Sequence, residues 1–174
     1  MFLYLAMIDS DADKSKFEIL YSEYKNLMYY TANRILHNSS DAEDVVHQAF
    51  LKVIEILDTI SSPRCHKTRA LLVTITEHKA IDLYREKQRR NVLPLAEEYV
   101  GAAEIERLAE RDTLAAAIAS LPPRYRSVLL LRYDCGYSNA EIANILDTTE
   151  PNVRKLIQRA KEKLSAALSG MEEP

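Results

Sequence analysis

Residues Tyr137–Lys163 read YSNAEIANILDTTEPNVRKLIQRAKEK, a pattern that predicts two helices joined by a three-residue turn. Ser138 followed by Glu141 is a capping box, in which the two residues satisfy backbone N–H groups at a helix start. A helix should therefore begin near Asn139. Asp147 belongs to the few non-glycine residue types that tolerate left-handed backbone angles, and it should end this helix.

The second predicted helix follows at once. Thr148 or Thr149 can cap it. Glu150 suits the positive end of the helix dipole, and Pro151 is tolerated in a first turn. One face of this helix carries side chains that can donate hydrogen bonds to base edges and phosphates in a major groove, namely Arg154, Lys155, Gln158, Arg159 and Lys161. The pattern predicts a DNA-binding helix-turn-helix, although two short helices of an ordinary bundle would also fit these residues.

Composition allows one domain or two small ones. The chain has 174 residues, 47% of them hydrophobic and only three of them glycine, which favours helices with a substantial core. Cys65 and Cys135 are far apart, which indicates a reducing compartment without a disulfide framework. Cys65-His66 lacks further ligands at a suitable spacing, so we predict no metal and no other cofactor.

The first nine residues, MFLYLAMID, are apolar but lack the basic lead and the cleavage site of a signal peptide. No other segment approaches the length that a membrane span requires. We therefore expect a soluble, cytoplasmic protein with no membrane insertion.

The charge distribution favours nucleic-acid binding more than the net charge of -3 does. Residues 61–90 hold eight Lys and Arg against three Asp and Glu, and residues 120–170 hold eight against five. Between them, residues 91–119 hold two basic residues against six acidic ones. Because local fields attract phosphate, two basic segments around an acidic one predict two nucleic-acid contacts flanking a linker.

Hydrophobic periodicity predicts helices through most of the chain. One helix should cover 14–36 and end at His37. A second should run to about Leu57 from a possible capping box of Ser40 and Glu43, with Asp41 as the rival cap. A third, long helix is predicted to begin at Pro63. Its segment 70–76, ALLVTIT, should be the centre of a core, and its end, KAIDLYREKQRR, is basic.

The second half of the chain is also predicted to be helical. Periodicity returns over 102–120, stops at Leu121-Pro122-Pro123, and restarts from Pro123 through Tyr133. We therefore predict an all-α fold with two small helical domains, residues 1–90 and 113–174. A flexible acidic linker over 91–112 should join them, and the second domain should be the helix-turn-helix.

Three segments together resemble regions 2 and 4 of the extracytoplasmic-function (ECF) sigma factors of bacterial RNA polymerase. They are SDAEDVVHQAFLKV (Ser40–Val53), LLVTITEHKAIDLYREKQRR (Leu71–Arg90) and LPPRYRSVLLLRYDCGYSNAEIANILDTTEPNVRKLIQRAKEKL (Leu121–Leu164). The resemblance implies that residues 1–90 are region 2 and residues 113–174 are region 4. It further implies a factor that binds core RNA polymerase and promoter DNA, that is not an enzyme, and that is held by an anti-sigma factor.

The resemblance also assigns roles by position. Residues on the helix that docks on core polymerase are Asp41, Asp44, Val45, Gln48, Ala49 and Leu51. Residues that read or hold the -10 element are His78, Lys79, Tyr84, Arg85, Lys87, Arg89 and Arg90. Residues that bind the -35 element are Arg132, Arg154, Lys155, Gln158 and Arg159, with Arg126 as a second backbone contact.

Several of these positions leave alternatives open. Tyr84 can stack on an unpaired base or pack inward. His78 stands where the family often has asparagine, and Leu71 stands where many members have tryptophan. Lys161 and Lys163 can be plain solvated charges.

Two other functional classes compete with the sigma factor. A stand-alone helix-turn-helix regulator with a helical sensor domain would bind duplex DNA tightly without core polymerase. A helical hydrolase is disfavoured, because the sequence has four scattered histidines and no glycine-rich phosphate loop.

Overall fold

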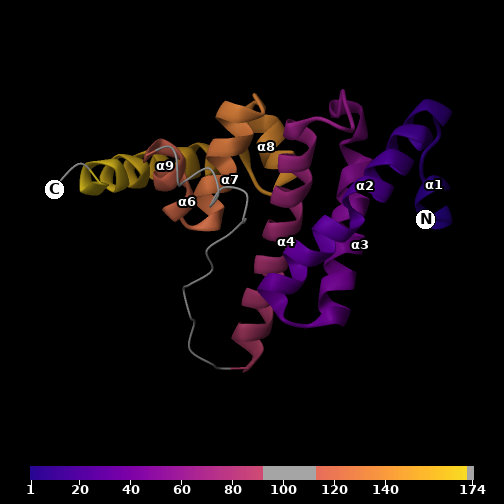
Figure 1. Ribbon diagram of the computed structural model, residues 1–174, viewed down its shortest axis with the longest axis horizontal. Coiled ribbons are helices and arrows are strands. Elements are labelled where there is room, and N and C mark those ends of the chain that lie inside the picture. Colours follow the sequence, from indigo (N-terminus) through magenta and orange to yellow (C-terminus); the bar gives the residue numbers. More distant parts are fainter. Residues whose placement is uncertain (92–112, 172–174) are drawn as a thin grey trace. The chain divides into compact units, whose positions relative to one another are not determined.

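Every regular element in the described part of the chain, residues 1–91 and 113–171, is helical in the computed structural model (Figure 1). The predicted all-α fold is confirmed there. The chain divides into two units, Met1–Pro94 and Leu95–Pro174. The predicted linker, 91–112, lies outside the described residues except for Asn91, as does the part of the predicted helix before Thr113. The domain boundaries therefore stay a prediction.

Unit 1 is built on three long helices that all contact one another. They are α2 (Asp11–Leu36), α3 (Ser39–Glu55) and α4 (His66–Asn91), preceded by the short α1 (Phe2–Leu5) and interrupted by the 3-10 turn η1 (Leu57–Thr59). The core consists of apolar side chains at helical spacing, among them Phe17, Leu20, Met28, Phe50, Val53, Leu71, Leu72 and Ile75. The predicted role of segment 70–76 as a core centre agrees with this burial.

The start of α3 differs from the prediction. Asn38 caps the helix, because its backbone is extended and its side-chain oxygen accepts a hydrogen bond from the Asp41 backbone N–H at 3.0 Å. The proposed caps Ser40 and Asp41 lie inside the first turn instead. His37, at φ 50°, takes the left-handed conformation that ends α2, so the connection between the two helices is only His37 and Asn38.

The long helix α4 begins at His66 and not at Pro63. Cys65 precedes its first turn. The Cys65 sulfur accepts from the Thr68 backbone N–H at 3.4 Å, and its carbonyl accepts from Arg69 N–H at 3.1 Å. The Pro63 carbonyl is bound by the Tyr24 hydroxyl of α2 at 2.9 Å, which holds the loop outside the helix.

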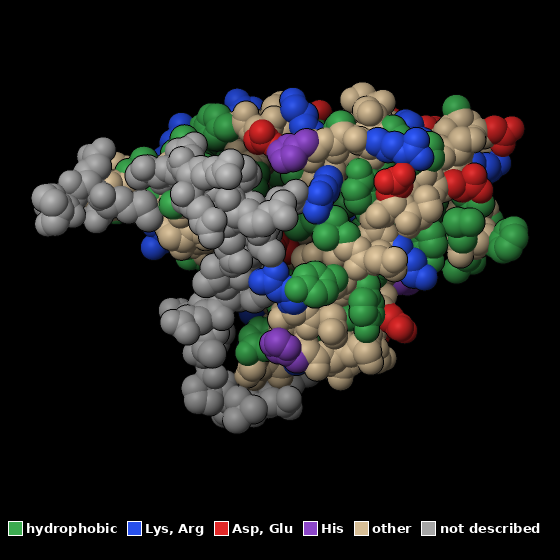
Figure 2. Space-filling model, viewed as in Figure 1, with side chains coloured by type: hydrophobic (Ala, Val, Ile, Leu, Met, Phe, Trp, Pro, Cys, Tyr) green, Lys and Arg blue, Asp and Glu red, His purple; other side chains and the backbone are tan. Residues whose placement is uncertain are grey.

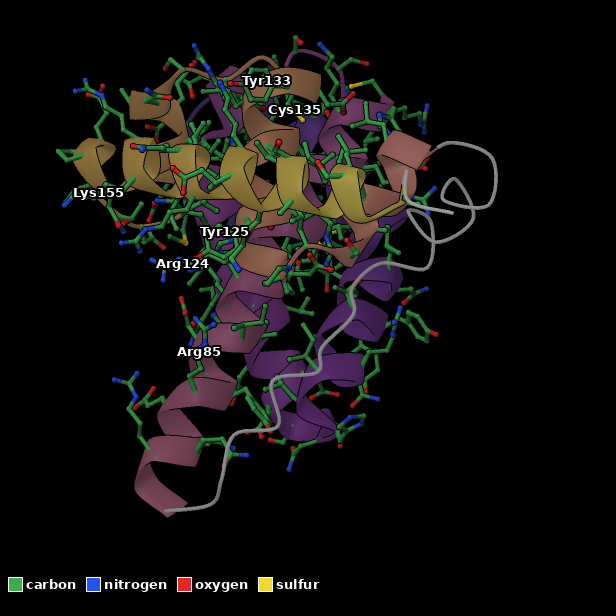
Figure 3. All side chains as sticks on the ribbon, turned by 90° about the vertical axis from the view of Figure 1, so that its left-hand side faces the viewer. Arg85, Arg124, Tyr125, Tyr133, Cys135 and Lys155 are labelled. Atoms are coloured by element: carbon green, nitrogen blue, oxygen red, sulfur yellow. The ribbon has the colours of Figure 1, made fainter. Side chains whose placement is uncertain are left out.

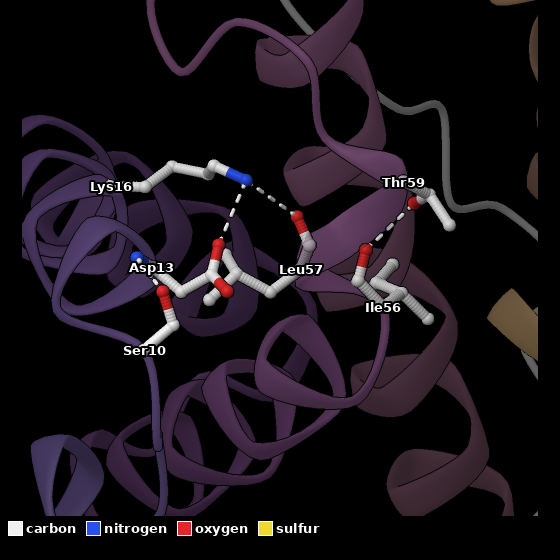
Figure 4. A network of polar contacts seen from close by, with 6 residues as sticks. All are labelled: Ser10, Asp13, Lys16, Ile56, Leu57 and Thr59. Carbon is white, nitrogen blue, oxygen red and sulfur yellow. Dashed lines mark hydrogen bonds and ion pairs between the residues drawn. The ribbon is translucent and has the colours of Figure 1, made fainter.

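A polar network joins the beginning of α2 to η1, directly after α3 (Figure 4). Lys16 Nζ lies 3.1 Å from Asp13 Oδ1 and donates to the Leu57 carbonyl at 3.2 Å. Ser10 caps α2 by accepting from the Asp13 backbone N–H at 3.4 Å. The Thr59 hydroxyl donates to the Ile56 carbonyl at 2.7 Å. These bonds provide hydrogen-bond partners for the Asp13 N–H and for the Ile56 and Leu57 carbonyls, which lie at helix ends.

Tyr4 attaches α1 to the rest of unit 1. Its ring packs against Phe17, Tyr21 and Phe50, and its hydroxyl lies 2.6 Å from His47 Nδ1 of α3. Burial, with a smaller contribution from Tyr21, raises the pKa of the Tyr4 phenol. Phe2 on the same short helix is 91% exposed, and Figure 2 shows apolar side chains at the surface beside the N-terminus.

Unit 2 packs its helices on one long helix. The elements are α6 (Thr113–Ser120), α7 (Pro123–Leu129), the π-helical turn η2 (Leu130–Asp134), α8 (Asn139–Ile145) and α9 (Glu150–Met171). Helix α9 contacts α6, α7 and α8. The predicted restart at Pro123 is confirmed. The helix then widens over Leu130–Asp134, and Gly136 at φ 83° supplies the turn into α8.

Candidate nucleic-acid interface

The capping box predicted at the start of α8 is present. The Glu141 backbone N–H donates to Ser138 Oγ at 3.2 Å, and the Ser138 backbone N–H donates to Glu141 Oε2 at 2.7 Å. Hydrogen bonds from the Ser138 side chain and, second, from its backbone amide lower the pKa of the Glu141 carboxyl. Helix α8 therefore begins where the local sequence requires, which fixes the position of the turn that follows.

The turn between α8 and α9 is held by backbone and side-chain bonds. Asp147 has the predicted left-handed backbone, at φ 50°. The Thr148 backbone N–H donates to the Ala143 carbonyl at 2.9 Å, and Asn152 Nδ2 donates to Thr148 Oγ1 at 2.8 Å. The Thr149 carbonyl accepts from Val153 N–H at 3.0 Å, which starts α9. The turn, residues 146–149, is one residue longer than predicted.

Helix α9 separates its apolar and polar side chains. Val153, Leu156 and Ala160 are buried against the rest of unit 2. The four -35 residues predicted on this helix are all exposed and lie on the opposite side, and Figure 3 shows Lys155 projecting from it; they are Arg154, Lys155, Gln158 and Arg159. The structure thus gathers four hydrogen-bond donors on one exposed face, which we call the α9 donor face.

Two of these donors are held by acidic neighbours that sequence reasoning did not assign. Arg154 pairs with Glu150, and Gln158 Nε2 donates to Glu162 Oε1 at 3.2 Å. Both pairs are four residues apart on the helix, a spacing that brings side chains together and that the sequence already contains. Glu150 and Glu162 therefore help to set the direction of the side chains that would read DNA.

The arginines that precede α8 differ in their surroundings. Arg132 is exposed, and its guanidinium donates to the Tyr137 carbonyl at 3.0 Å. Arg126 is 1% exposed and donates to the Ala119 carbonyl at 3.2 Å. The hypothesis that Arg126 contacts the DNA backbone is therefore wrong, because its side chain stabilises the fold of unit 2.

Two lysines in the middle of α9 lie over tyrosine rings. Lys161 Nζ is 5.3 Å from the ring centre of Tyr133, and Lys163 Nζ is 5.7 Å from that of Tyr125. Such cation–π contacts help to fix the lysines in place. Both lysines remain exposed, and each also contacts a tyrosine ring.

The basic end of α4 carries a second group of predicted residues. Arg85 and Arg89 are exposed and lie four residues apart, and Figure 3 shows Arg85 projecting from the helix. Tyr84 is half-buried, and its hydroxyl accepts from Gln88 Nε2 at 2.9 Å. His78 and Lys79 are half-buried on an earlier turn. The side chain of Arg90 lies outside the described part.

Lys87 differs from the other basic residues of this segment. Its ammonium donates to both carboxylate oxygens of Asp41, a residue of α3 that was predicted to face polymerase. Two predicted interfaces, one for polymerase and one for DNA, therefore meet in one ion pair within unit 1.

The remaining polymerase-facing residues of α3 fall into two groups. Asp44 and Gln48 are exposed, and Leu51 is half-buried. Val45 and Ala49 are 1% and 0% exposed, because they pack into the core of unit 1. Both residues therefore hold the helix that presents Asp44 and Gln48, and their own contact with polymerase stays a prediction.

The described residues contain neither a metal-ligand cluster nor a membrane-spanning helix. Within 1–91 and 113–171, no three His, Cys, Asp or Glu side chains come together as metal ligands. No helix in these same stretches combines the length and the apolar character that crossing a bilayer needs. Neither Cys65 nor Cys135 forms a disulfide bond.

Comparison with known families matches both units. Residues 20–90 match the family described as sigma-70 region 2, and residues 111–164 match sigma-70, region 4. Together the two ranges cover more than half of the chain.

Individual relatives match along most of their length. The ECF RNA polymerase sigma factor SigL of Mycobacterium tuberculosis is 27% identical over 162 residues, covering 90% of this chain and 91% of SigL. SigW of Bacillus subtilis is 26% identical over 171 residues, covering 90% of each chain. A solved structure described as CnrH in complex with the cytosolic domain of CnrY is 28% identical, covers 88% of each chain and aligns with a TM-score of 0.40.

Proposed function

Since this chain belongs to the ECF group of the sigma-70 family, we propose how its two units divide the work of a promoter-specific initiation factor. As an RNA polymerase sigma factor it binds core polymerase and promoter DNA. In our proposal, the exposed face of α3 binds polymerase, the basic end of α4 holds the -10 element, and α9 reads the -35 element as duplex.

The α9 donor face is the observation that carries this proposal. Its side chains are exposed, while Val153, Leu156 and Ala160 bury the other side of the same helix. A helix-turn-helix places such a helix in the major groove with its N-terminal residues foremost. Arg154 and Lys155, in the first turns, would meet base edges there, and Arg132 would meet the phosphate backbone.

For the -10 element we propose contact through Arg85 and Arg89. Both are exposed arginines on the same side of α4, in a segment with more basic than acidic residues. A positive surface of this kind binds the phosphates of an unpaired strand, and half-buried Tyr84, directly before Arg85 in sequence, would offer a ring on which a base stacks. His78 and Lys79 extend this surface toward the core of unit 1.

For polymerase we propose contact through Asp44 and Gln48 of α3, with Leu51 at the edge. Their exposure on a helix whose other side is buried gives a polar surface on a rigid support. We place this activity in the cytoplasm, where bacterial polymerase works, and we assign the chain no catalytic step of its own. The family also leads us to propose an anti-sigma factor as a regulatory partner.

Transcription in vitro with core polymerase and a promoter library tests the proposal. Wild-type chain should give specific initiation above core alone. Arg154→Ala and Arg159→Ala should lose promoter choice while keeping core binding, whereas Arg124→Ala, which removes an exposed arginine of α7, should keep both. Absence of specific initiation with the wild-type chain would exclude the proposed function.

A further inference from the structure

The ion pair between Asp41 and Lys87 joins two helices of unit 1 across 46 residues of sequence. Asp41 lies in the first turn of α3, and Lys87 lies in the last two turns of α4. The Lys87 side chain is 48% exposed, but that of Asp41 is only 16% exposed. In an ordinary surface ion pair, water screens both partners, and the pair contributes little to stability. The Asp41–Lys87 pair differs because water screens Asp41 much less.

The position of Asp41 is fixed before Lys87 is considered. Its backbone N–H donates to the Asn38 side chain, which caps α3. Its carboxylate stands at the positive end of the helix dipole, where an anion is favoured. A carboxylate so largely removed from water requires partners, and the Lys87 ammonium occupies both of its oxygens. The backbone N–H and both carboxylate oxygens of Asp41 thus have hydrogen-bond partners within unit 1.

Helix geometry separates Lys87 from the arginines around it. Successive residues of an α-helix are about 100° apart, so Lys87 lies about 160° around the axis from both Arg85 and Arg89. The two arginines themselves are about 40° apart on the exposed side. The basic run of α4 therefore has an outward face of arginines and an inward lysine that reaches α3.

The end of α4 is less deeply buried than its earlier turns. Of the residues from Ile81 to Arg89, all described, none is fully buried, whereas Leu71, Leu72 and Ile75 on the earlier turns are. Helix ends with few buried contacts open easily, and the like charges of Arg85 and Arg89 oppose the helix at a four-residue spacing. An ion pair to α3 opposes both effects.

We propose that Asp41 is a positioning residue that clamps the end of α4 through Lys87, so that Arg85 and Arg89 face the promoter strand. This reassigns Asp41 from polymerase contact and Lys87 from DNA contact. The inference rests on the proposed -10 role of α4. In this arrangement, α3 carries the polymerase-facing Asp44 and Gln48 on one side and orients the DNA-facing helix from its first turn.

A charge swap tests the clamp in the full chain assembled with core polymerase. Four chains are compared: wild type, Asp41→Lys, Lys87→Asp and the double swap. The readout is binding of a labelled single-stranded -10 oligonucleotide. Each single change should weaken binding about 5- to 20-fold, which lies within the range of coupling expected for contacting residues, and the double swap should return it to within about twofold of wild type. Core affinity should stay unchanged in all four.

A matched double variant controls for net charge. Glu43 is an exposed acid on the same helix, two residues from Asp41, and the cap of α3 is formed by Asn38 instead of by Glu43. Glu43→Lys combined with Lys87→Asp has the same total charge as the swap but cannot rebuild the pair, so its binding of the -10 oligonucleotide should remain weak.

Hydrogen exchange of the amides in 83–89 should accelerate in the single variants and slow again only in the swap. Asp41→Asn removes the charge without reversing it, so it tests the clamp even if a reversed charge unfolds the chain. It should also weaken binding of the -10 oligonucleotide, but less than Asp41→Lys does.

The outcomes separate this inference from the proposed function. If Lys87 itself contacts phosphate, the swap stays as weak as Lys87→Asp, and the clamp is wrong. If Asp41 contacts polymerase, Asp41→Lys loses core affinity and the swap does not regain it, which also overturns the clamp. A wild-type holoenzyme that binds no -10 strand would instead remove the proposed function.

Discussion

The basic end of α4 and the donor face of α9 look alike in sequence but differ in structure. On α9, the predicted side chains are exposed, and their acidic partners Glu150 and Glu162 lie on the same helix. On α4, the predicted basic residues divide between an outward face and an inward ion pair with α3. A run of basic residues on a helix therefore forms one exposed positive face only where apolar residues at helical spacing bury the opposite side of that helix.

The largest expected effect tests whether the two regions depend on different cores. Leu72 is fully buried where α4 packs in unit 1. Leu72→Ala should lower the free energy of unfolding by about 2–5 kcal/mol, because it removes buried methyl groups and leaves a cavity. Thermal unfolding followed by circular dichroism measures this, and binding of -35 duplex at low salt should remain. Equal loss of duplex binding would show that the α9 donor face depends on unit 1.

The next effect concerns how α9 reads DNA. Arg159→Ala and Arg154→Ala should each cost about 1–3 kcal/mol of discrimination between the correct -35 duplex and one with a changed base pair. Arg132→Ala should weaken both duplexes alike and reduce the salt slope by about one unit, as expected of a phosphate contact. Anisotropy titrations of holoenzyme at several salt concentrations distinguish these roles. Uniform weakening by the α9 changes would mean that this face only attracts phosphate.

A smaller effect concerns the start of α8. Ser138→Ala should destabilise unit 2 by about 1 kcal/mol, since it removes the capping hydroxyl. Folding lowers the pKa of the Glu141 carboxyl. The ionised carboxylate therefore stabilises the folded state fully at pH values above the pKa of a glutamate in the unfolded chain. This stabilisation is lost as the pH falls through the lowered pKa of the folded state. The wild-type chain should therefore lose more stability on acidification than Ser138→Ala. Chemical unfolding at a series of pH values measures the difference, and parallel pH profiles would contradict it.

The smallest effect concerns the partner of Arg154. Glu150→Gln should reduce base discrimination by about 0.2–0.5 kcal/mol, the usual contribution of a helical pair at this spacing, because Arg154 would lose its fixed direction. Total affinity should rise slightly, since one negative charge near the DNA is removed. Competition between matched and mismatched -35 duplexes measures both quantities. Unchanged discrimination would mean that Glu150 does not orient Arg154.

The helix-turn-helix could be predicted almost to the residue because its signals are local. The capping box at Ser138, the left-handed Asp147 and the apolar spacing around Val153 each depend on a few neighbouring residues. The true starts of α3 and α4 could not be predicted in this way. Several consecutive residues could cap α3. Because His37 takes the left-handed conformation that ends α2, the next residue, Asn38, becomes the cap. The Pro63 carbonyl is bound by Tyr24, which is far away in sequence.

The candidate site shows the same limit. Family resemblance placed Val45 and Ala49 in a polymerase-binding motif, but a motif does not separate residues that contact a partner from those that pack the helix. Lys87 and Asp41 were assigned to different partners, because nothing local reveals a pair formed across 46 residues. The acids beside Arg154 and Gln158, by contrast, could have been found from their four-residue spacing.

Footprinting of one selected promoter, with and without core polymerase, tests the central claim most directly. We expect the chain alone to give little protection. With core polymerase it should protect two separate segments, an upstream duplex that Arg154→Ala weakens and a downstream segment whose bases become reactive as single strands. Protection of one segment only, or equal protection by the chain without core polymerase, would contradict the account of two units acting together on one promoter.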